Sequence, residues 1–148
     1  MTTNTRRFCL VAAGLLGAMA IALGAFHAHG LESWLESCGL SNELIERRMD
    51  NVGSGVRYQM FHALALLGLA ALMQKSKSRL LGWIAAGFML GTFLFSGSLY
   101  AIVFTGQTWF GMVAPLGGLT LIVSWAALIF EKVPGIGGNG SSVRVIDE

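Results

Sequence analysis

Hydrophobic residues fill four long segments of the chain, and short polar stretches separate them. The segments cover about residues 8–28, 58–73, 80–104 and 112–130. Between residues 80 and 130 there is no Asp, Glu, Lys or Arg at all. A charge at the centre of a bilayer costs about 3 kcal/mol or more, so membrane spans avoid charged residues. The pattern is therefore typical of a membrane protein.

The length of these segments and their lack of polar–apolar alternation predict helices. A helix rises about 1.5 Å per residue and needs about 20 residues to cross a hydrocarbon core of about 30 Å. Residues 80–130 allow two crossings with a turn near Thr105–Thr108. Polar and apolar residues do not alternate, which excludes barrel strands, and backbone groups in lipid must be paired within the segment. The sequence predicts an all-α fold, an integral membrane four-helix bundle. The second segment is short and is expected to begin earlier, with Arg57 reaching the interface.

Composition supports this class. Of 148 residues, 54% are hydrophobic and only 12% are charged, against about 25% charged in soluble domains. Such a chain has too few polar residues to cover a surface that faces water. The net charge of +2 comes without a basic and aromatic cluster, so nucleic acid is not an expected partner. The lipid bilayer is the expected partner, together with a second copy of the chain or another membrane protein.

The distribution of Lys and Arg predicts the orientation. With four spans, both termini lie on the same side as the connection at residues 74–79. That side holds seven basic residues: Arg6, Arg7, Lys75, Lys77, Arg79, Lys132 and Arg144. The other side holds three: Arg47, Arg48 and Arg57. Both termini are therefore expected in the cytoplasm. The alternative is a cleaved signal peptide, with Arg6 and Arg7 as its charged region and residues 25–28 as the cleavage site.

The polar stretches divide the chain further. Residues 1–7 form a leader, and residues 131–148, rich in Gly and Ser, are expected to be a disordered cytoplasmic tail. The external loop at residues 30–57 carries a capping-box pattern at Ser33 and Glu36. An apolar stripe in this loop predicts a short amphipathic helix, with Gly53–Gly55 as a break before the second span. The stripe consists of Leu40, Leu44, Ile45, Met49 and Val52.

Small residues recur where spans could pack. Lipid provides no hydrophobic drive for helix pairing, so small residues that allow close approach matter. The candidates for helix packing are Gly17, Gly24, Gly87, Gly91, Gly117 and Gly118. They fit packing within one bundle or a homodimer face. Pro115 precedes the last two and fits either a helix start or a kink.

Polar side chains gather toward one end of three spans. The candidate polar cluster consists of His29, Tyr58, Gln59, His62, Ser96, Ser98 and Tyr100. Polar groups in lipid should meet one another, so a structural hydrogen-bond network is the leading interpretation. A proton or solute path through His62 is a second. A metal site on His27, His29 and His62 is a third, but residues two apart on a helix point to opposite sides. No metal, cofactor or catalytic residue is predicted, and Cys9 and Cys38 are expected on opposite sides of the bilayer.

Four segments carry a resemblance to a known family. They are LGAFHAHGL at 23–31, VRYQMFHALALL at 56–67, LFSGSLY at 94–100 and PLGG at 115–118. Together they resemble the domain of unknown function 423 family of small bacterial inner-membrane proteins, which includes eukaryotic transmembrane protein 256. The resemblance implies four membrane helices and no established activity. The whole polar cluster and Pro115 match its motif positions, whereas His27 departs from them.

These observations favour a small multi-pass inner-membrane protein that is not an enzyme and has an accessory or binding role. One alternative is an oligomeric transporter of protons or small solutes that uses the polar cluster. The other is a metal-binding membrane protein.

Overall fold

Residues 2–76 and 78–132 are described by a computed structural model, and within these ranges all regular structure is helical. The predicted tail at 131–148 lies outside the described residues beyond Lys132. The elements run in the order α1 (Thr2–His29), α2 (Leu31–Ser37), α3 (Asn42–Leu72), α4 (Arg79–Thr105), the 3-10 turn η1 (Thr108–Met112) and α5 (Ala114–Leu128).

Four helical segments are long and apolar enough to cross a membrane. They are Asn4–His29, Asn42–Leu72, Arg79–Thr105 and Thr108–Leu128. Large apolar side chains remain exposed along all of them, as expected for helices whose outer faces are covered by acyl chains. The predicted class, an all-helical protein with four membrane-spanning helices and one short extra helix, is confirmed.

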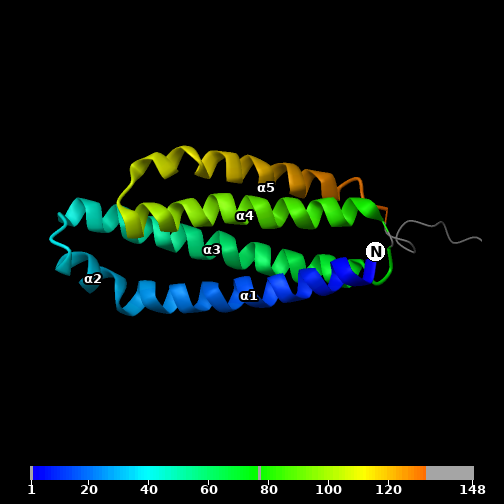
Figure 1. Ribbon diagram of the computed structural model, residues 1–148, viewed down its shortest axis with the longest axis horizontal. Coiled ribbons are helices and arrows are strands. Elements are labelled where there is room, and N and C mark those ends of the chain that lie inside the picture. Colours follow the sequence, from blue (N-terminus) through cyan, green and yellow to red (C-terminus); the bar gives the residue numbers. More distant parts are fainter. Residues whose placement is uncertain (1, 77, 133–148) are drawn as a thin grey trace, which may run out of the picture.

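The spans pack in the order α1, α3, α4, α5, each antiparallel to its neighbour (Figure 1). Helix α1 packs on α3, α3 on α4 and α4 on α5, while α1 and α5 make no contact within the described ranges. The bundle is therefore open on the side between its first and last spans. The N-terminus, the connection between α3 and α4 and the end of α5 share one end of the molecule, called here the terminal end (Figure 1). The opposite end, which carries α2, is called the loop end.

Helix α3 begins sixteen residues before the segment predicted from hydropathy, at Asn42 and not at Tyr58. Its 31 residues extend for about 46 Å, longer than the hydrocarbon core. The predicted separate amphipathic helix over residues 40–52 is therefore wrong: these residues form mainly the first turns of α3. The predicted break at Gly53–Gly55 is also absent. A glycine inside a helix costs only about 1 kcal/mol, and contacts across the bundle offset that cost.

The short extra helix is α2, at residues that hydropathy did not single out. Its N-cap is Gly30 and Ser33 lies inside it, so the predicted capping box at Ser33 does not form. Leu31 and Leu35 are fully buried, which anchors α2 on the loop end of the bundle.

Two apolar clusters fill the interior. The first, toward the terminal end, joins α1, α3, α4 and α5 around Cys9, Leu66, Leu81 and Phe88. The second, toward the loop end, joins α2, α3 and α4 around Leu31, Val52 and Val103. The buried polar side chains of the spans lie between and beside these clusters.

Candidate functional site

Gln59 is the centre of the buried polar cluster. Its side chain is 2% exposed. The amide Nε2 donates to the carbonyl oxygen of Leu16 in α1 at 2.8 Å. The amide Oε1 accepts a hydrogen bond from the Tyr100 hydroxyl in α4 at 3.0 Å. One side chain of α3 thus connects three spans, and its donor and acceptor ends are both used.

Tyr100 reaches Gln59 because α3 carries a glycine where the two helices meet. A Cβ atom added to Gly55 would lie 2.6 Å from Cε1 of Tyr100. Beside it, the Ser96 hydroxyl donates to the Gly55 carbonyl oxygen at 2.8 Å. Gly55 therefore gives the tyrosine ring its place, and Ser96 fixes the two helices at the same point.

His62 forms a second bridge, between α3 and α5. The Trp125 indole Nε1 lies 3.1 Å from His62 Nε2. An indole N–H can only donate, so Nε2 must be the acceptor and carries no proton. The other ring nitrogen, Nδ1, lies 2.7 Å from the Tyr58 carbonyl oxygen, and a carbonyl can only accept. The two partners therefore fix His62 as the neutral imidazole with its proton on Nδ1.

Aromatic rings enclose this imidazole. The rings of Phe88 and Trp125 lie with centroids 5.4 Å and 6.2 Å from that of His62. The His62 side chain is 3% exposed. With both nitrogens occupied and both sides covered, the ring has no free electron pair for a ligand.

The remaining members of the predicted cluster do not join these bridges. Ser98 donates to the Phe95 carbonyl oxygen of its own helix at 2.8 Å. Tyr58 contributes only its carbonyl, while its ring is 43% exposed and packs on Phe95. His29 is exposed at the end of α1. The seven residues thus divide into three sets. Gln59, Tyr100 and Ser96 connect α3 to its neighbours near Gly55. Tyr58 and His62 contact each other within α3, and Ser98 and His29 contact no other member.

Three further contacts between the spans were not predicted from the sequence. Trp125 belongs to no predicted cluster, yet it is the partner of His62. His27 Nε2 lies 3.0 Å from the Met49 carbonyl oxygen, and the Arg48 guanidinium donates to the Val103 carbonyl oxygen at 2.9 Å. A cation near the last carbonyls of a helix is a common C-terminal partner. The available signal was therefore Arg48, which the sequence predicted in the external loop and which lies in α3.

The predicted packing glycines separate into two groups. Gly87, Gly91 and Gly117 lie in the contact of α4 with α5. A Cβ added to Gly117 would clash with the backbone nitrogen of Phe95 and lie 2.8 Å from its Cα, and one on Gly91 would lie 2.6 Å from Leu121 Cδ2. A Cβ on Gly87 would clash with the Ser124 hydroxyl. Here the helices touch at backbone distance.

The other three glycines have room. A Cβ on Gly24 would lie 3.4 Å from Val56 Cγ1, and one on Gly118 would lie 3.8 Å from the Phe95 ring. Gly17 has no neighbour within 4 Å of an added Cβ. Pro115 occupies the first turn of α5, the position of a helix start.

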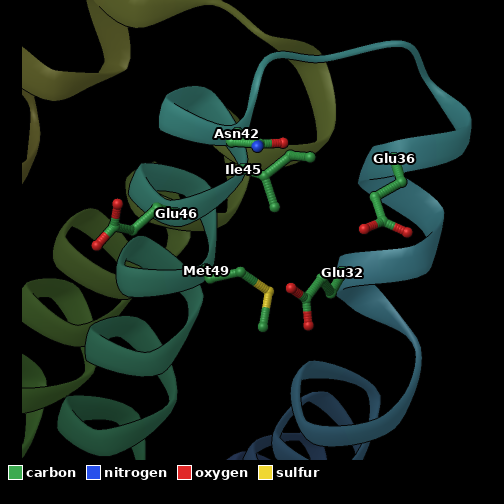
Figure 2. Close-up of a pocket in the computed structure, with 6 residues that line it drawn as sticks. All are labelled: Glu32, Glu36, Asn42, Ile45, Glu46 and Met49. Atoms are coloured by element: carbon green, nitrogen blue, oxygen red, sulfur yellow. The ribbon is translucent and has the colours of Figure 1, made fainter.

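A pocket opens at the loop end, away from the polar bridges. It has a volume of about 300 Å³ and lies between α2 and the first turns of α3 (Figure 2). Its lining residues are Glu32, Glu36, Asn42, Ile45, Glu46 and Met49. Despite these carboxylates, no group of three His, Cys, Asp or Glu in the part of the chain that the structure describes is arranged to hold a metal ion. Cys9 is buried and Cys38 exposed, and both thiols are free.

The fold and its bridges define the class: a small, all-helical, multi-pass integral membrane protein. The chain belongs to the family described as protein of unknown function (DUF423), which matches residues 23–118. It is 37% identical over 129 residues to the UPF0382 inner membrane protein YgdD of Escherichia coli K12, covering 87% of this chain and 92% of that one.

Further relatives come from other bacteria. The UPF0382 membrane protein of Haemophilus influenzae is 36% identical over 123 residues, or 82% of this chain and 90% of the relative. The UPF0382 membrane protein YwdK of Bacillus subtilis is 36% identical over 118 residues, or 78% and 87%. No solved structure matches the chain. The resemblance derived from the four motifs is confirmed, and the chain is an inner, multi-pass membrane protein.

Proposed function

We propose that this protein is a non-enzymatic accessory protein of the inner membrane, which acts by binding another membrane component. The supporting observation is that its most reactive buried groups already serve the fold. Gln59 uses both ends of its amide between α1 and α4. His62 uses both ring nitrogens between Tyr58 and Trp125. A catalytic or transport site needs such groups free to meet a substrate.

Transport of protons or small solutes, the alternative function, has less support. A proton path requires a group that changes protonation during the cycle. No Asp or Glu occurs between residues 58 and 130 or before Glu32, and Glu43, Glu46 and Asp50 lie in the loop-end part of α3. The buried His62 is therefore the candidate. Protonating its Nε2 would place two N–H donors against each other and break the contact with Trp125. Each cycle would then disrupt the bridge between α3 and α5.

The orientation is part of the proposal. Both termini are placed in the cytoplasm because the terminal end carries most of the basic residues. Alkaline phosphatase and green fluorescent protein fused after residue 132 test it. Fluorescence without phosphatase activity is expected, and active phosphatase would overturn the orientation.

Two measurements test the accessory role. In proteoliposomes containing a pH-sensitive dye, the purified protein should give no proton flux above that of protein-free vesicles. A tagged chain purified in mild detergent should retain a stoichiometric membrane component that a Gly117→Ala variant, with α5 displaced, loses. Flux that disappears in a folded His62→Gln variant would overturn the proposal and favour transport.

A further inference from the structure

Five basic residues meet at the terminal end of the bundle, although they are far apart in the sequence. They form what we call the basic rim: Arg6, Arg7, Lys75, Arg79 and Lys132. The start of α1, the connection between α3 and α4 and the end of α5 all lie at this end (Figure 1). Contacts fix these segments together. A Cβ on Gly82 in α4 would lie 3.9 Å from the Thr5 methyl group of α1, and the Ser76 hydroxyl donates to Glu131 at 2.9 Å.

The rim has almost no acidic counterpart. Glu131 is the one carboxylate at this end within the described residues, and it accepts a hydrogen bond from Ser76. The one ion pair formed within residues 2–76 and 78–132 joins Arg47 to Glu43, at the loop end. Among the residues that the structure describes, the rim is therefore a concentration of positive charge without an ion-pair partner.

Arg6 gives the clearest sign of a missing anion. Its Nε is buried but has no acceptor among the residues that the structure describes. A buried donor without a partner loses its hydration and gains nothing in return. A guanidinium presents its donors in a planar fork that matches two oxygens of a phosphate. The Arg6 side chain as a whole is only half-buried, so a phosphate group outside the polypeptide would satisfy this donor once the guanidinium turned toward it.

Aromatic residues place the rim at headgroup depth. Phe8 directly follows Arg7, and Trp83 lies one helical turn after Arg79 on the same helix face. Their side chains are 54% and 77% exposed, which in a membrane means that they face lipid. Tryptophan prefers the level where acyl chains meet headgroups. The guanidinium groups beside these rings therefore lie at the level of lipid phosphates.

We propose that the basic rim binds the headgroup of an anionic phospholipid, with Arg6 and Arg79 as its principal phosphate ligands. The loop end would not, because its glutamates and Asp50 outnumber its arginines. The choice of leaflet rests on the orientation proposed above. Binding in detergent does not depend on orientation or on an accessory role, so a failure here is distinguishable from a failure of either.

The test compares phosphatidylglycerol with phosphatidylcholine on the full-length protein in mild detergent. Native mass spectrometry measures the bound lipid, and the melting temperature measures stabilisation. We expect phosphatidylglycerol to be retained about tenfold more than phosphatidylcholine, and Arg6→Gln with Arg79→Gln to abolish this preference, since each basic residue near an anionic surface contributes about fivefold. The matched control, Arg47→Gln with Arg57→Gln, removes two charges from the loop end and should keep the preference.

A second pair of variants and a competitor test the same binding. If the Arg6 and Arg79 variant does not fold, Lys75→Gln with Lys132→Gln should still reduce the preference. Excess inorganic phosphate should not displace the lipid, because it lacks the acyl chains that the exposed aromatics contact. Equal retention of the two lipids, equal loss in the loop-end control, or displacement by free phosphate would each overturn the proposal.

Discussion

The helix pairs at the two sides of the bundle are held by different means. Helices α4 and α5 touch at backbone distance through glycines, with the Cα of Phe95 only 2.8 Å from where a Gly117 Cβ would lie. Helices α1 and α3 pack through small residues such as Ala13 and Ala20, and the long side chain of Gln59 completes the contact. Gly17, on the same face region of α1, has open space around it.

These are two ways in which helices can associate inside a membrane, where the hydrophobic effect does not drive them together. Close backbone approach multiplies dispersion contacts, and an interhelical hydrogen bond satisfies groups that lipid cannot solvate. Close backbone approach is disrupted by an added atom, whereas an interhelical hydrogen bond is disrupted by the loss of its donor or acceptor. Substitutions on the two sides should therefore fail in opposite ways.

The largest effect is expected from a single methyl group at the α4–α5 contact. In Gly117→Ala the added Cβ meets the backbone of Phe95, which cannot rotate away, so the helices must separate. We expect a loss of about 3 kcal/mol in the free energy of unfolding, as for severe overpacking. The measurement is unfolding in detergent followed by circular dichroism. The control is Gly118→Ala, and a similar result for both variants would contradict the close packing.

The next effect is expected from Gln59→Leu at the α1–α3 contact. Leucine fills a similar volume but leaves the hydroxyl of the half-buried Tyr100 without its acceptor and removes the bond to Leu16. We expect a loss of about 2 kcal/mol, near the upper range for interhelical hydrogen bonds in membranes. Tyr100→Phe removes one of the two bonds and should cost about half. A neutral Gln59→Leu variant would show that the network contributes nothing.

A smaller effect is expected from Trp125→Phe, which keeps an aromatic ring but removes the donor to His62. The expected loss is about 1 kcal/mol at neutral pH. The bridge requires neutral His62, so protonation opposes folding and stability should fall as the pH is lowered. Because the variant has no bridge to break, its loss on acidification should be smaller than that of the wild type. Parallel pH profiles of the melting temperature would contradict the assigned tautomer.

The smallest effect is expected from Gly17→Ala on α1. No atom lies within 4 Å of the added methyl group, and alanine favours the helix by up to about 1 kcal/mol. The melting temperature should stay unchanged or rise slightly. A marked loss of stability, or a smaller oligomer on size-exclusion chromatography, would reveal a second chain packed at this position.

The spans could be predicted from the sequence because a charge-free run of this length has one physical explanation. The start of α3 could not, because Glu43, Glu46 and Asp50 resemble a separate surface helix. Continuity through Gly53–Gly55 depends on contacts from other helices, such as Tyr100 on Gly55. The motif residues Gln59, Ser96 and Tyr100 were placed together by depth and helix face alone.

The contact between His62 and Trp125 could not be predicted from the sequence. Counting residues from the predicted span ends puts Trp125 and His62 at opposite interfaces. Their contact depends on where α3 begins and on how α5 is shifted along α4, which the glycine contacts at Gly91 and Gly117 set. Sequence periodicity gives the face of a helix but not its axial position against a neighbour.

Hydrogen bonds between polar side chains are expected to hold α1, α3 and α4 together. A double-mutant cycle of Gln59→Leu and Tyr100→Phe, measured as reversible unfolding in bicelles, tests it most directly. We expect a coupling energy of about 1 kcal/mol between the two residues, since the second substitution removes a bond that the first has already broken. Strictly additive effects would contradict it.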